Sequence, residues 1–165
     1  MKKCATLIMF LISLQLFAPN ERIDIKFEQS KFIEVQLNNR ALINTTKEVI
    51  KIASIIKKHE SDNNYQAIGA SGEYGAYQFM YMTWEQYCYK FLGKVVLQTE
   101  INQDIIAFAK INDLLMEGYS SEQIASIWNS GKPEYENKIG YNKMNVYYNV
   151  PAYVEKFMNE YNKMI

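Results

Sequence analysis

The chain has 165 residues, which is enough for one compact domain and little more. It is 48% hydrophobic and 22% charged, and its 18 basic and 18 acidic residues cancel. Because no block of Lys or Arg forms a basic patch, we do not expect it to bind nucleic acid. The 13 Tyr, 8 Phe and 2 Trp suit either an aromatic core and rim or a surface that stacks on sugar rings.

Residues 1–19 have the pattern of an export signal. Lys2 and Lys3 precede an apolar stretch from Cys4 to Ala18, which is short for a membrane span. We therefore expect a signal peptide or N-terminal anchor, with the protein exported to the periplasm, the cell exterior or the cell wall; an uncleaved signal would hold it at the membrane. A buried N-terminal helix is the alternative. Only Cys88 lies outside this segment, so the sequence predicts no internal disulfide and no Cys/His metal site.

The rest of the chain divides into a lead-in segment and a helical domain. In residues 20–43 apolar and polar positions alternate, as in short strands, but no glycine turn separates the alternating runs. From about residue 44 the apolar residues recur with helical spacing, which predicts a mainly α domain over residues 44–165. A glycine-rich loop interrupts it.

Caps and stops predict the helix boundaries in this domain. The predicted helices are residues 45–59, begun by Thr45 or Thr46; 83–91, capped by Thr83 and stopped by Gly93; 99–117, ended by Gly118; 120–128, begun by a capping box of Ser120 and Gln123; and a last helix with Pro151 in its first turn. Cys88 lies on an apolar face of the second of these, which predicts a small buried side chain rather than a reactive thiol.

Glu60 lies in the last turn of the first predicted helix, directly before the loop. The loop opens with Ser61-Asp62-Asn63-Asn64 and contains three of the chain's seven glycines within seven positions. At a helix end, the helix holds the backbone of a residue rigidly while its carboxyl group stays accessible to a substrate, which suits a catalytic acid. Taken alone, such a residue is more often a solvated surface group, so the role depends on what surrounds it.

Four segments, in the same order, resemble the motifs of the soluble lytic transglycosylases, a family related to goose-type lysozymes. They are Glu60-Ser61, Gly75-Ala76-Tyr77-Gln78, Trp128-Asn129-Ser130-Gly131, and a closing stretch with Tyr147-Tyr148 and Tyr153-Val154. Gln78 follows Glu60 by 18 positions, the spacing expected for the family. The Gly-Tyr-Gly, Gln-Phe and Thr-Trp pattern is also similar to the resuscitation-promoting factors. The resemblance covers roughly residues 49–161; it departs from the family at Gly69, often Ser, and at Tyr81-Met82-Thr83, usually Pro-x-Thr.

The resemblance implies a lysozyme-like fold, at most α+β through a small loop or hairpin, with the catalytic Glu at a helix end facing a cleft. It implies cleavage of the β-1,4 bond between N-acetylmuramic acid and N-acetylglucosamine in peptidoglycan. Glu60 would be the single general acid and base, a 1,6-anhydro ring would close, and neither cofactor nor metal is expected. The substrate-binding residues it implies are Ser61, Ser71, Gly75, Tyr77, Gln78, Trp128, Asn129 and Tyr147.

An acid role for Glu60 requires a raised pKa. A free Glu has a pKa of about 4.3 and is ionised at pH 7. Apolar or aromatic surroundings destabilise the carboxylate and raise that value. The candidates for such walls are Tyr65, Tyr77, Phe79 and Trp84.

Glu73 in the glycine-rich loop leaves the reaction type open. If this second carboxylate holds an attacking water, the enzyme is a hydrolytic muramidase rather than a lyase. A third reading is a glycan-binding or assembly module of a secretion, conjugation or phage machine with little turnover. Each reading has peptidoglycan strands as the partner, and we expect a monomer. We interpret Asp62 as a loop-capping residue, and His59 as a surface or packing residue because helix neighbours do not face each other.

Overall fold

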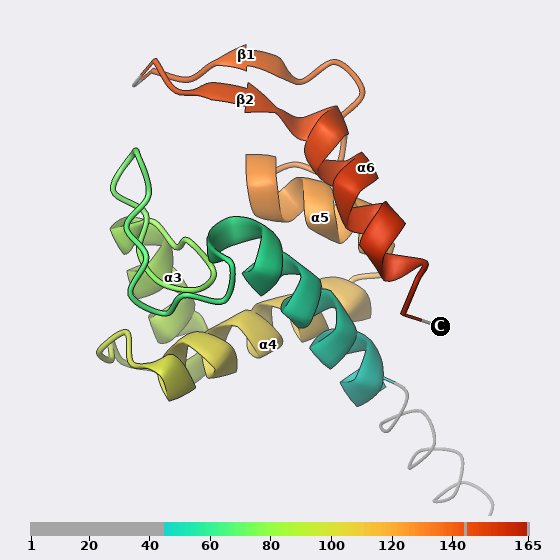
Figure 1. Cartoon of the computed structure of the whole chain (residues 1–165). Coiled ribbons are helices and arrows are strands. Elements are labelled where there is room, and N and C mark those ends of the chain that lie inside the picture. The colour runs from blue at the N-terminus through green and yellow to red at the C-terminus, as the bar shows by residue number, and fades with distance from the viewer. Residues whose placement is uncertain (1–44, 144, 165) are drawn as a thin grey trace, which may run out of the picture. The chain divides into compact units, whose positions relative to one another are not determined.

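The computed structural model describes residues 45–143 and 145–164, all within one compact unit of the chain (Figure 1). The predicted signal at 1–19 and the lead-in segment at 20–43 lie outside these residues. The described part is mainly helical and contains one small antiparallel hairpin, which confirms the predicted mainly α class. Within it, no helix combines the length and the apolar character that a bilayer crossing requires.

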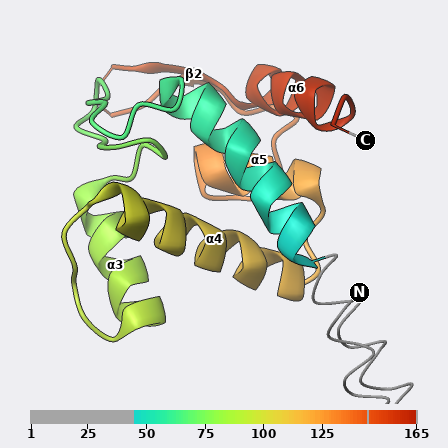
Figure 2. The same cartoon turned by 60° about the horizontal axis from the view of Figure 1, so that its bottom comes forward.

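The helices follow one another in the predicted order, and a hairpin to which the sequence analysis gave no position precedes the last of them. A helix at 45–61 leads into the glycine-rich loop, which ends where α3 begins. The further elements are α3 (Tyr81–Leu92), α4 (Glu100–Met116), α5 (Ser121–Ser130), β1 (Ile139–Tyr141), β2 (Tyr147–Asn149) and α6 (Val150–Tyr161). The two strands pair antiparallel, with Gly140 opposite Tyr148. In both cartoons the helix at 45–61 lies between α4 and α6 (Figures 1 and 2).

Local capping signals explain most of these boundaries. The Thr99 hydroxyl accepts a hydrogen bond from the Asn102 N–H at the start of α4, and Ser120 and Gln123 form the predicted capping box of α5. Gly93 ends α3 in the left-handed conformation that glycine adopts at lowest cost. Pro151 lies in the first turn of α6, as predicted.

Three predicted boundaries were wrong. The first helix continues to residue 61, two residues beyond its predicted end. α3 begins at Tyr81, two residues before Thr83, because the carbonyl of Met80 accepts the N–H of Trp84 and closes the first turn without a side-chain cap. Thr83 therefore lies inside the helix. α5 continues to Ser130, two residues beyond the predicted end, and Gly131 ends it at φ 75°.

The core lies where the helix at 45–61 meets α4, α5 and α6. From that helix Ile52, Ile55 and Ile56 are buried, and they belong to the same apolar cluster as Ile106 of α4 and Phe157 of α6. Cys88 is fully buried in this cluster, as its apolar neighbours predicted. Burial of this kind is the main source of stability in a small domain.

Candidate active site

Glu60 lies in the last turn of the helix at 45–61, with its carboxyl group against α6. Its Oε1 accepts a 2.8 Å hydrogen bond from the Tyr153 hydroxyl. Burial destabilises the charged form and raises the pKa of Glu60 to about 7, although the Tyr153 hydrogen bond and the positive charge of Lys110 act in the opposite direction. A large fraction of this carboxyl group therefore carries its proton at neutral pH, as a general acid requires.

Tyr153 is held in place by the packing of α6 on the helix that carries Glu60. Burial and the neighbouring Glu60 carboxylate raise the pKa of Tyr153 well above its ordinary value, so its hydroxyl keeps its proton and donates. The His59 ring lies edge-on to Tyr153 at 5.8 Å and to Phe157 at 6.4 Å. Its side chain is 2% exposed and its Nε2 lies 3.0 Å from Glu160 Oε1. Of the two predicted roles of His59, surface or packing, the buried side chain fits packing, and the ring contacts Tyr153 and Phe157 of α6.

Glu73 is the second carboxylate of the site. Its Oε2 accepts a 2.9 Å hydrogen bond from the Ser71 N–H, and its negative charge contributes to the raised pKa of Glu60. A Cβ atom on Gly69 would collide with the Glu73 carboxylate and with Oε1 of Gln78. Glycine at this position thus lets the ends of both side chains lie directly against the loop backbone, and a Ser would require them to move.

Gln78 and Gly75 shape the loop rather than protrude from it. Gln78 has φ 49°, in the left-handed region, and its Nε2 donates to the Gly75 carbonyl at 2.8 Å. Gly75 has φ 86°, and a Cβ there would collide with the carboxamide of Gln103. Gln103, which is fully buried on α4, accepts the Ala76 N–H at 2.7 Å and donates to the Tyr65 carbonyl at 3.1 Å. The sequence reasoning missed this brace between α4 and the loop.

Ser61 and Tyr77 also stabilise the loop, through hydrogen bonds within the protein. The Ser61 hydroxyl donates to the Ala76 carbonyl at 2.9 Å and accepts the Asn64 N–H at 3.0 Å. Tyr77 is 1% exposed, and its hydroxyl donates to Asp104 Oδ1 at 2.7 Å. In this structure, both side chains are bound to the protein itself and hold the segment that carries Gln78.

The remaining predicted contact residues lie in different surroundings. Ser71 is half-buried, and its Oγ has no hydrogen-bond partner within the described part of the chain. Trp128 Nε1 donates to the Tyr77 carbonyl at 3.3 Å, so this indole lies at the junction of α5 and the loop. Asn129 is exposed near the end of α5. Tyr147 is exposed on β2, with its ring 5.4 Å from that of Tyr141.

The aromatic residues proposed as walls form part of the core. The Phe79 ring lies 5.7 Å from Trp84 and 5.4 Å from Trp128, and Tyr77 packs 6.2 Å from Phe79. Tyr65 donates its hydroxyl to Asp104 at 2.8 Å. This cluster supports the glycine-rich loop, while the hydroxyl that reaches Glu60 comes from Tyr153.

Lys110 is a further residue that the sequence reasoning missed. It lies on α4, is 6% exposed, and its Nζ is 3.9 Å from the centroid of the Trp128 ring. Tyr87 and Phe79 provide two more rings, at 5.0 and 5.9 Å. The sequence does contain a signal for Lys110, because it follows Ile106 by one helical turn and so lies on the buried face of α4. A charged residue on a buried helix face is uncommon and indicates a specific role.

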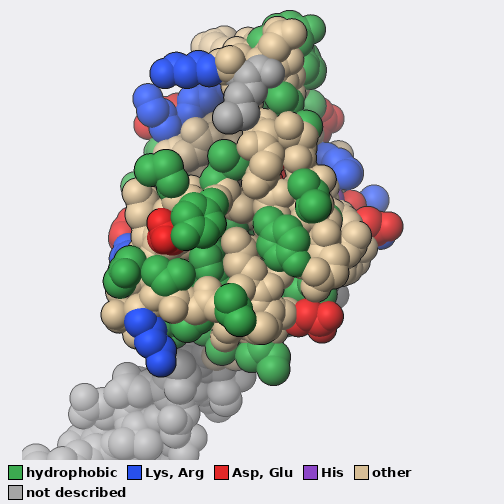
Figure 3. Space-filling view, turned by 90° about the vertical axis from the view of Figure 1, so that its left-hand side faces the viewer, with side chains coloured by type: hydrophobic (Ala, Val, Ile, Leu, Met, Phe, Trp, Pro, Cys, Tyr) green, Lys and Arg blue, Asp and Glu red, His purple; other side chains and the backbone are tan. Residues whose placement is uncertain are grey.

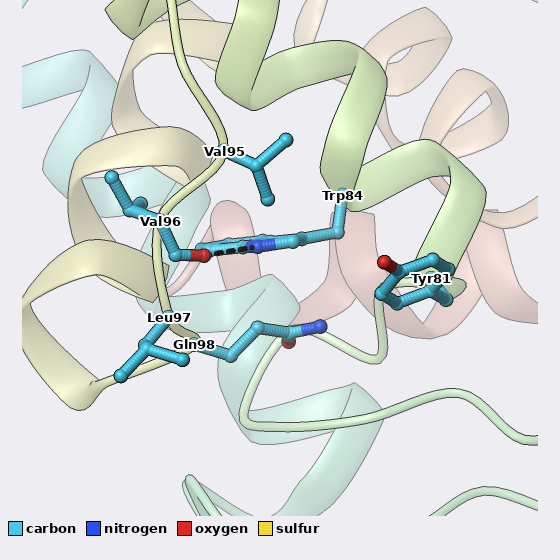
Figure 4. Close-up of a pocket in the computed structure, with 6 residues that line it drawn as sticks. All are labelled: Tyr81, Trp84, Val95, Val96, Leu97 and Gln98. Carbon is cyan, nitrogen blue, oxygen red and sulfur yellow. Dashed lines mark hydrogen bonds between the residues drawn. The ribbon is translucent and has the colours of Figure 1, made fainter.

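Several apolar side chains lie on the face shown in Figure 3. In the glycine-rich loop and α3, Ile68, Tyr81 and Met82 are exposed. A pocket of about 330 Å³ adjoins this region, between α3 and the segment that precedes α4 (Figure 4). Its lining residues are Tyr81, Trp84, Val95, Val96, Leu97 and Gln98. Glu60 is not among them, so this pocket is separate from the candidate site.

Within the described residues, no group of three or more His, Cys, Asp or Glu side chains is arranged to hold a metal ion. No protein-family model matches the chain, and no curated protein or solved structure matches it either. The chemistry of Glu60 and its neighbours is therefore the basis on which a function is assigned.

Proposed function

We propose that this chain is an exported peptidoglycan lytic transglycosylase with a lysozyme-like fold and Glu60 as its single general acid and base. The observation that carries the proposal is the half-buried carboxyl group of Glu60 at a helix end, held by the Tyr153 hydroxyl. Its pKa of about 7 and its hydrogen bond from Tyr153 match what protonation of a glycosidic oxygen requires. The order and spacing of the sequence motifs support glycan strands as the substrate.

In the first step Glu60 donates its proton to the oxygen between N-acetylmuramic acid and N-acetylglucosamine. As the C1–O bond breaks, the carbonyl oxygen of the muramic N-acetyl group bonds to C1, which replaces the second carboxylate that most glycosidases need. Glu60 is left as a carboxylate, which the Tyr153 hydroxyl stabilises through its hydrogen bond.

In the second step the Glu60 carboxylate takes the proton from the C6 hydroxyl of the muramic residue. The freed O6 bonds to C1, the N-acetyl oxygen leaves C1, and a 1,6-anhydro ring closes. Glu60 is protonated again, so one group serves as acid and then as base, with no net proton gained or lost. A pKa near neutrality suits both the acid step and the base step, because neither the protonated nor the ionised form of Glu60 is then strongly disfavoured.

Hydrolysis of the same bond is the second candidate, and the position of Glu73 favours it. Its carboxylate belongs to the same loop as Gln78, and its charge acts on Glu60. Such a group can orient a water for attack at C1, and the product would then carry a reducing end instead of an anhydro ring.

The test is the digestion of purified cell walls by the full chain, with mass spectrometry of the released fragments. We expect anhydro ends from the wild type and no release from Glu60→Gln, with Glu155→Gln on the exposed side of α6 as matched control. Reducing ends would establish hydrolysis. Release by Glu60→Gln at the wild-type rate would overturn the proposal, as would wall binding by the wild type without any product, which indicates a glycan-binding or assembly module.

A further inference from the structure

The pocket between α3 and the segment that precedes α4 has mostly apolar walls and no charged lining residue (Figure 4). Trp84, which is 1% exposed, lies at its bottom, while Leu97 and Tyr81 are 81% and 63% exposed and form its rim. Its volume of about 330 Å³ is at the lower end of the range for small-molecule sites. A pocket of this kind suits a small, uncharged ligand that has an apolar face.

The wall formed by residues 96–98 is fixed, although it belongs to no helix or strand. Its three consecutive carbonyls each accept a side-chain hydrogen bond, from Trp84 Nε1 at 2.9 Å, Asn102 Nδ2 at 2.8 Å and Gln103 Nε2 at 2.9 Å. Gln103 is the same buried side chain that accepts the Ala76 N–H of the glycine-rich loop. The pocket is therefore preformed, and it shares a brace with the loop of the candidate site.

The side chain of Gln98 is the exception in this well-bonded segment. Its Oε1 is buried, and no donor among the residues that the structure describes bonds to it. A buried acceptor without a partner destabilises the folded state, so such groups are rare and call for an explanation. Figure 4 shows the carboxamide of Gln98 beside the Trp84 ring. Because the last torsion of a glutamine is soft, this carboxamide can turn to meet an N–H of a ligand in the pocket.

Tyr81 presents an aromatic face at the rim of the same pocket. Its hydroxyl donates to Glu85 Oε1 at 2.7 Å, one turn further along α3, which fixes the direction of the ring. The ring nevertheless remains largely exposed. An aromatic ring that is held open in this way favours stacking on the apolar face of a sugar ring.

We propose that this pocket binds an N-acetylglucosamine unit of a glycan strand, with the sugar ring on Tyr81 and the acetamido group on Gln98. The inference deepens the proposed function and rests on it for the choice of a glycan as the ligand. An acetamido group combines a methyl group, which the apolar walls accept, with an N–H that Gln98 Oε1 can bond. Since Glu60 does not line the pocket, the bound sugar would hold the protein on the wall without taking part in cleavage.

The lining also selects between the two sugars of peptidoglycan. N-acetylmuramic acid carries a lactyl group that ends in a carboxylate or a peptide, and the six lining residues offer no charged partner for it. N-acetylglucosamine has the same acetamido group without that substituent. The pocket therefore suits the glucosamine unit of the strand.

The first experiment titrates the full chain, labelled with nitrogen-15, with the β-1,4-linked trimer of N-acetylglucosamine. The β-1,4-linked glucose trimer is the matched control ligand, because it lacks only the acetamido groups. The two tryptophan indole N–H signals, assigned by nuclear Overhauser contacts, report separate regions: Trp84 reports the pocket and Trp128 the glycine-rich loop.

We expect the Trp84 signal to shift with the acetylated trimer and to stay in place with the glucose trimer. An unmoved Trp84 signal would overturn the proposal, and a shift of Trp128 alone would place the sugar at the loop instead. Equal shifts with both trimers would overturn the recognition of the acetamido group.

The second experiment compares Gln98→Met, Tyr81→Ala and Tyr89→Ala. Tyr89 is the matched control, because it lies on the same helix and is 62% exposed but does not line the pocket. Gln98→Met keeps the length of the side chain and should weaken binding of the acetylated trimer about tenfold, through the lost hydrogen bond. Tyr81→Ala should weaken it about fivefold through lost stacking, and Tyr89→Ala should leave it unchanged. Wild-type affinity in Gln98→Met or Tyr81→Ala would overturn the assignment of that residue.

Thermal unfolding of Gln98→Met tests whether the carboxamide supports the fold instead. The variant loses no hydrogen bond to the described residues through its side chain, and it removes a buried acceptor without a partner. Its unfolding temperature should therefore equal or exceed that of the wild type. A lower unfolding temperature would show that Gln98 stabilises the protein itself, and would overturn its role in binding.

The titration separates this inference from the proposed function, because it needs no activity. If the Trp84 signal shifts as expected but cell walls are not cleaved, the catalytic function is wrong and the sugar pocket stands. If walls are cleaved and the Trp84 signal does not move, the pocket is overturned and the catalytic function stands.

Discussion

The Tyr153 hydroxyl and the Glu60 carboxyl group, 93 positions apart in the sequence, are joined by a 2.8 Å hydrogen bond. The bond links the end of the first described helix to α6 near the C-terminus, with the His59 ring packed against the same tyrosine. It satisfies one oxygen of a carboxyl group that burial has made costly to ionise. The acid and its donor thus form a pair whose properties can be tested separately.

Tyr153→Phe removes the donor and keeps the ring. Because the hydrogen bond lowers the pKa of Glu60, its loss should raise that pKa, and the alkaline limb of the kcat/KM profile should move to higher pH. We expect kcat to fall about tenfold or more, since the carboxylate loses a charge-assisted hydrogen bond. Tyr161→Phe is the control, because Tyr161 also lies on α6 but is bonded to Glu48. It should leave kcat and the alkaline limb of the kcat/KM profile unchanged. An unshifted limb in Tyr153→Phe would contradict the role of this bond.

Glu60→Gln should change stability in a pH-dependent way. The pKa of Glu60 is raised in the folded state from 4.5 to about 7, so the folded protein binds more protons than the unfolded chain between these values. The free energy of unfolding therefore falls as the pH rises through this window and levels off above it. A glutamine at this position does not ionise, so the free energy of unfolding of the variant lacks this dependence on pH.

We expect Glu60→Gln to be more stable than the wild type at pH 8, by about 2 kcal/mol after allowance for solvent screening. At pH 4 the difference should have largely disappeared. Urea unfolding at the two pH values measures it, and Glu155→Gln controls for a general change of charge. A difference that does not depend on pH would show that Glu60 is not the buried acid described above.

Gly75→Ala should destabilise the glycine-rich loop. The residue has φ 86°, and the added Cβ would collide with the buried Gln103 carboxamide that accepts the Ala76 N–H. We expect a loss of about 2–3 kcal/mol, through backbone strain and the broken hydrogen bond together. Gly72→Ala is the matched control, because φ is 90° there and the space is open, so only about 1 kcal/mol should be lost. Thermal unfolding compares the two, and equal losses would exclude the collision with Gln103.

Glu73→Gln distinguishes the two reaction types. In a lyase, Glu73 acts on Glu60 only through its charge, which raises the pKa of Glu60. The variant should then still produce anhydro ends, with the alkaline limb of its activity moved to lower pH. In a hydrolase, Glu73 holds the attacking water, and cleavage should fall by orders of magnitude. Mass spectrometry of the products, measured across pH, separates these outcomes.

The parts of the fold that the sequence could predict are those set by neighbouring residues. The capping box of Ser120 and Gln123, the cap at Thr99 and the stop at Gly93 are complete within a few positions. The location of Glu60 in a last helical turn before a turn-rich loop can likewise be predicted from neighbouring residues. The prediction that Thr83 caps α3 was wrong because a threonine is also tolerated inside the first turn of a helix. Here α3 begins after Met80 without a side-chain cap.

The parts that escaped prediction depend on contacts between distant segments. Nothing near Tyr153 in the sequence points to Glu60, and only the packing of α6 brings them together. Gln103 and Lys110 did leave a signal, since both are polar residues on the buried face of α4 beside Ile106. A periodic pattern assigns such positions to the core, but it contains no information about which distant groups they contact.

The position of Tyr153 has a consequence for the biosynthesis of the protein. A nascent chain acquires Glu60 early, but the residue that completes its surroundings belongs to α6, which is synthesised after the other described helices. Until that helix docks, Glu60 is more exposed to water and should titrate as an ordinary carboxylic acid. A chain truncated before α6 should therefore be inactive, and activity should begin only when α6 has docked on the rest of the domain.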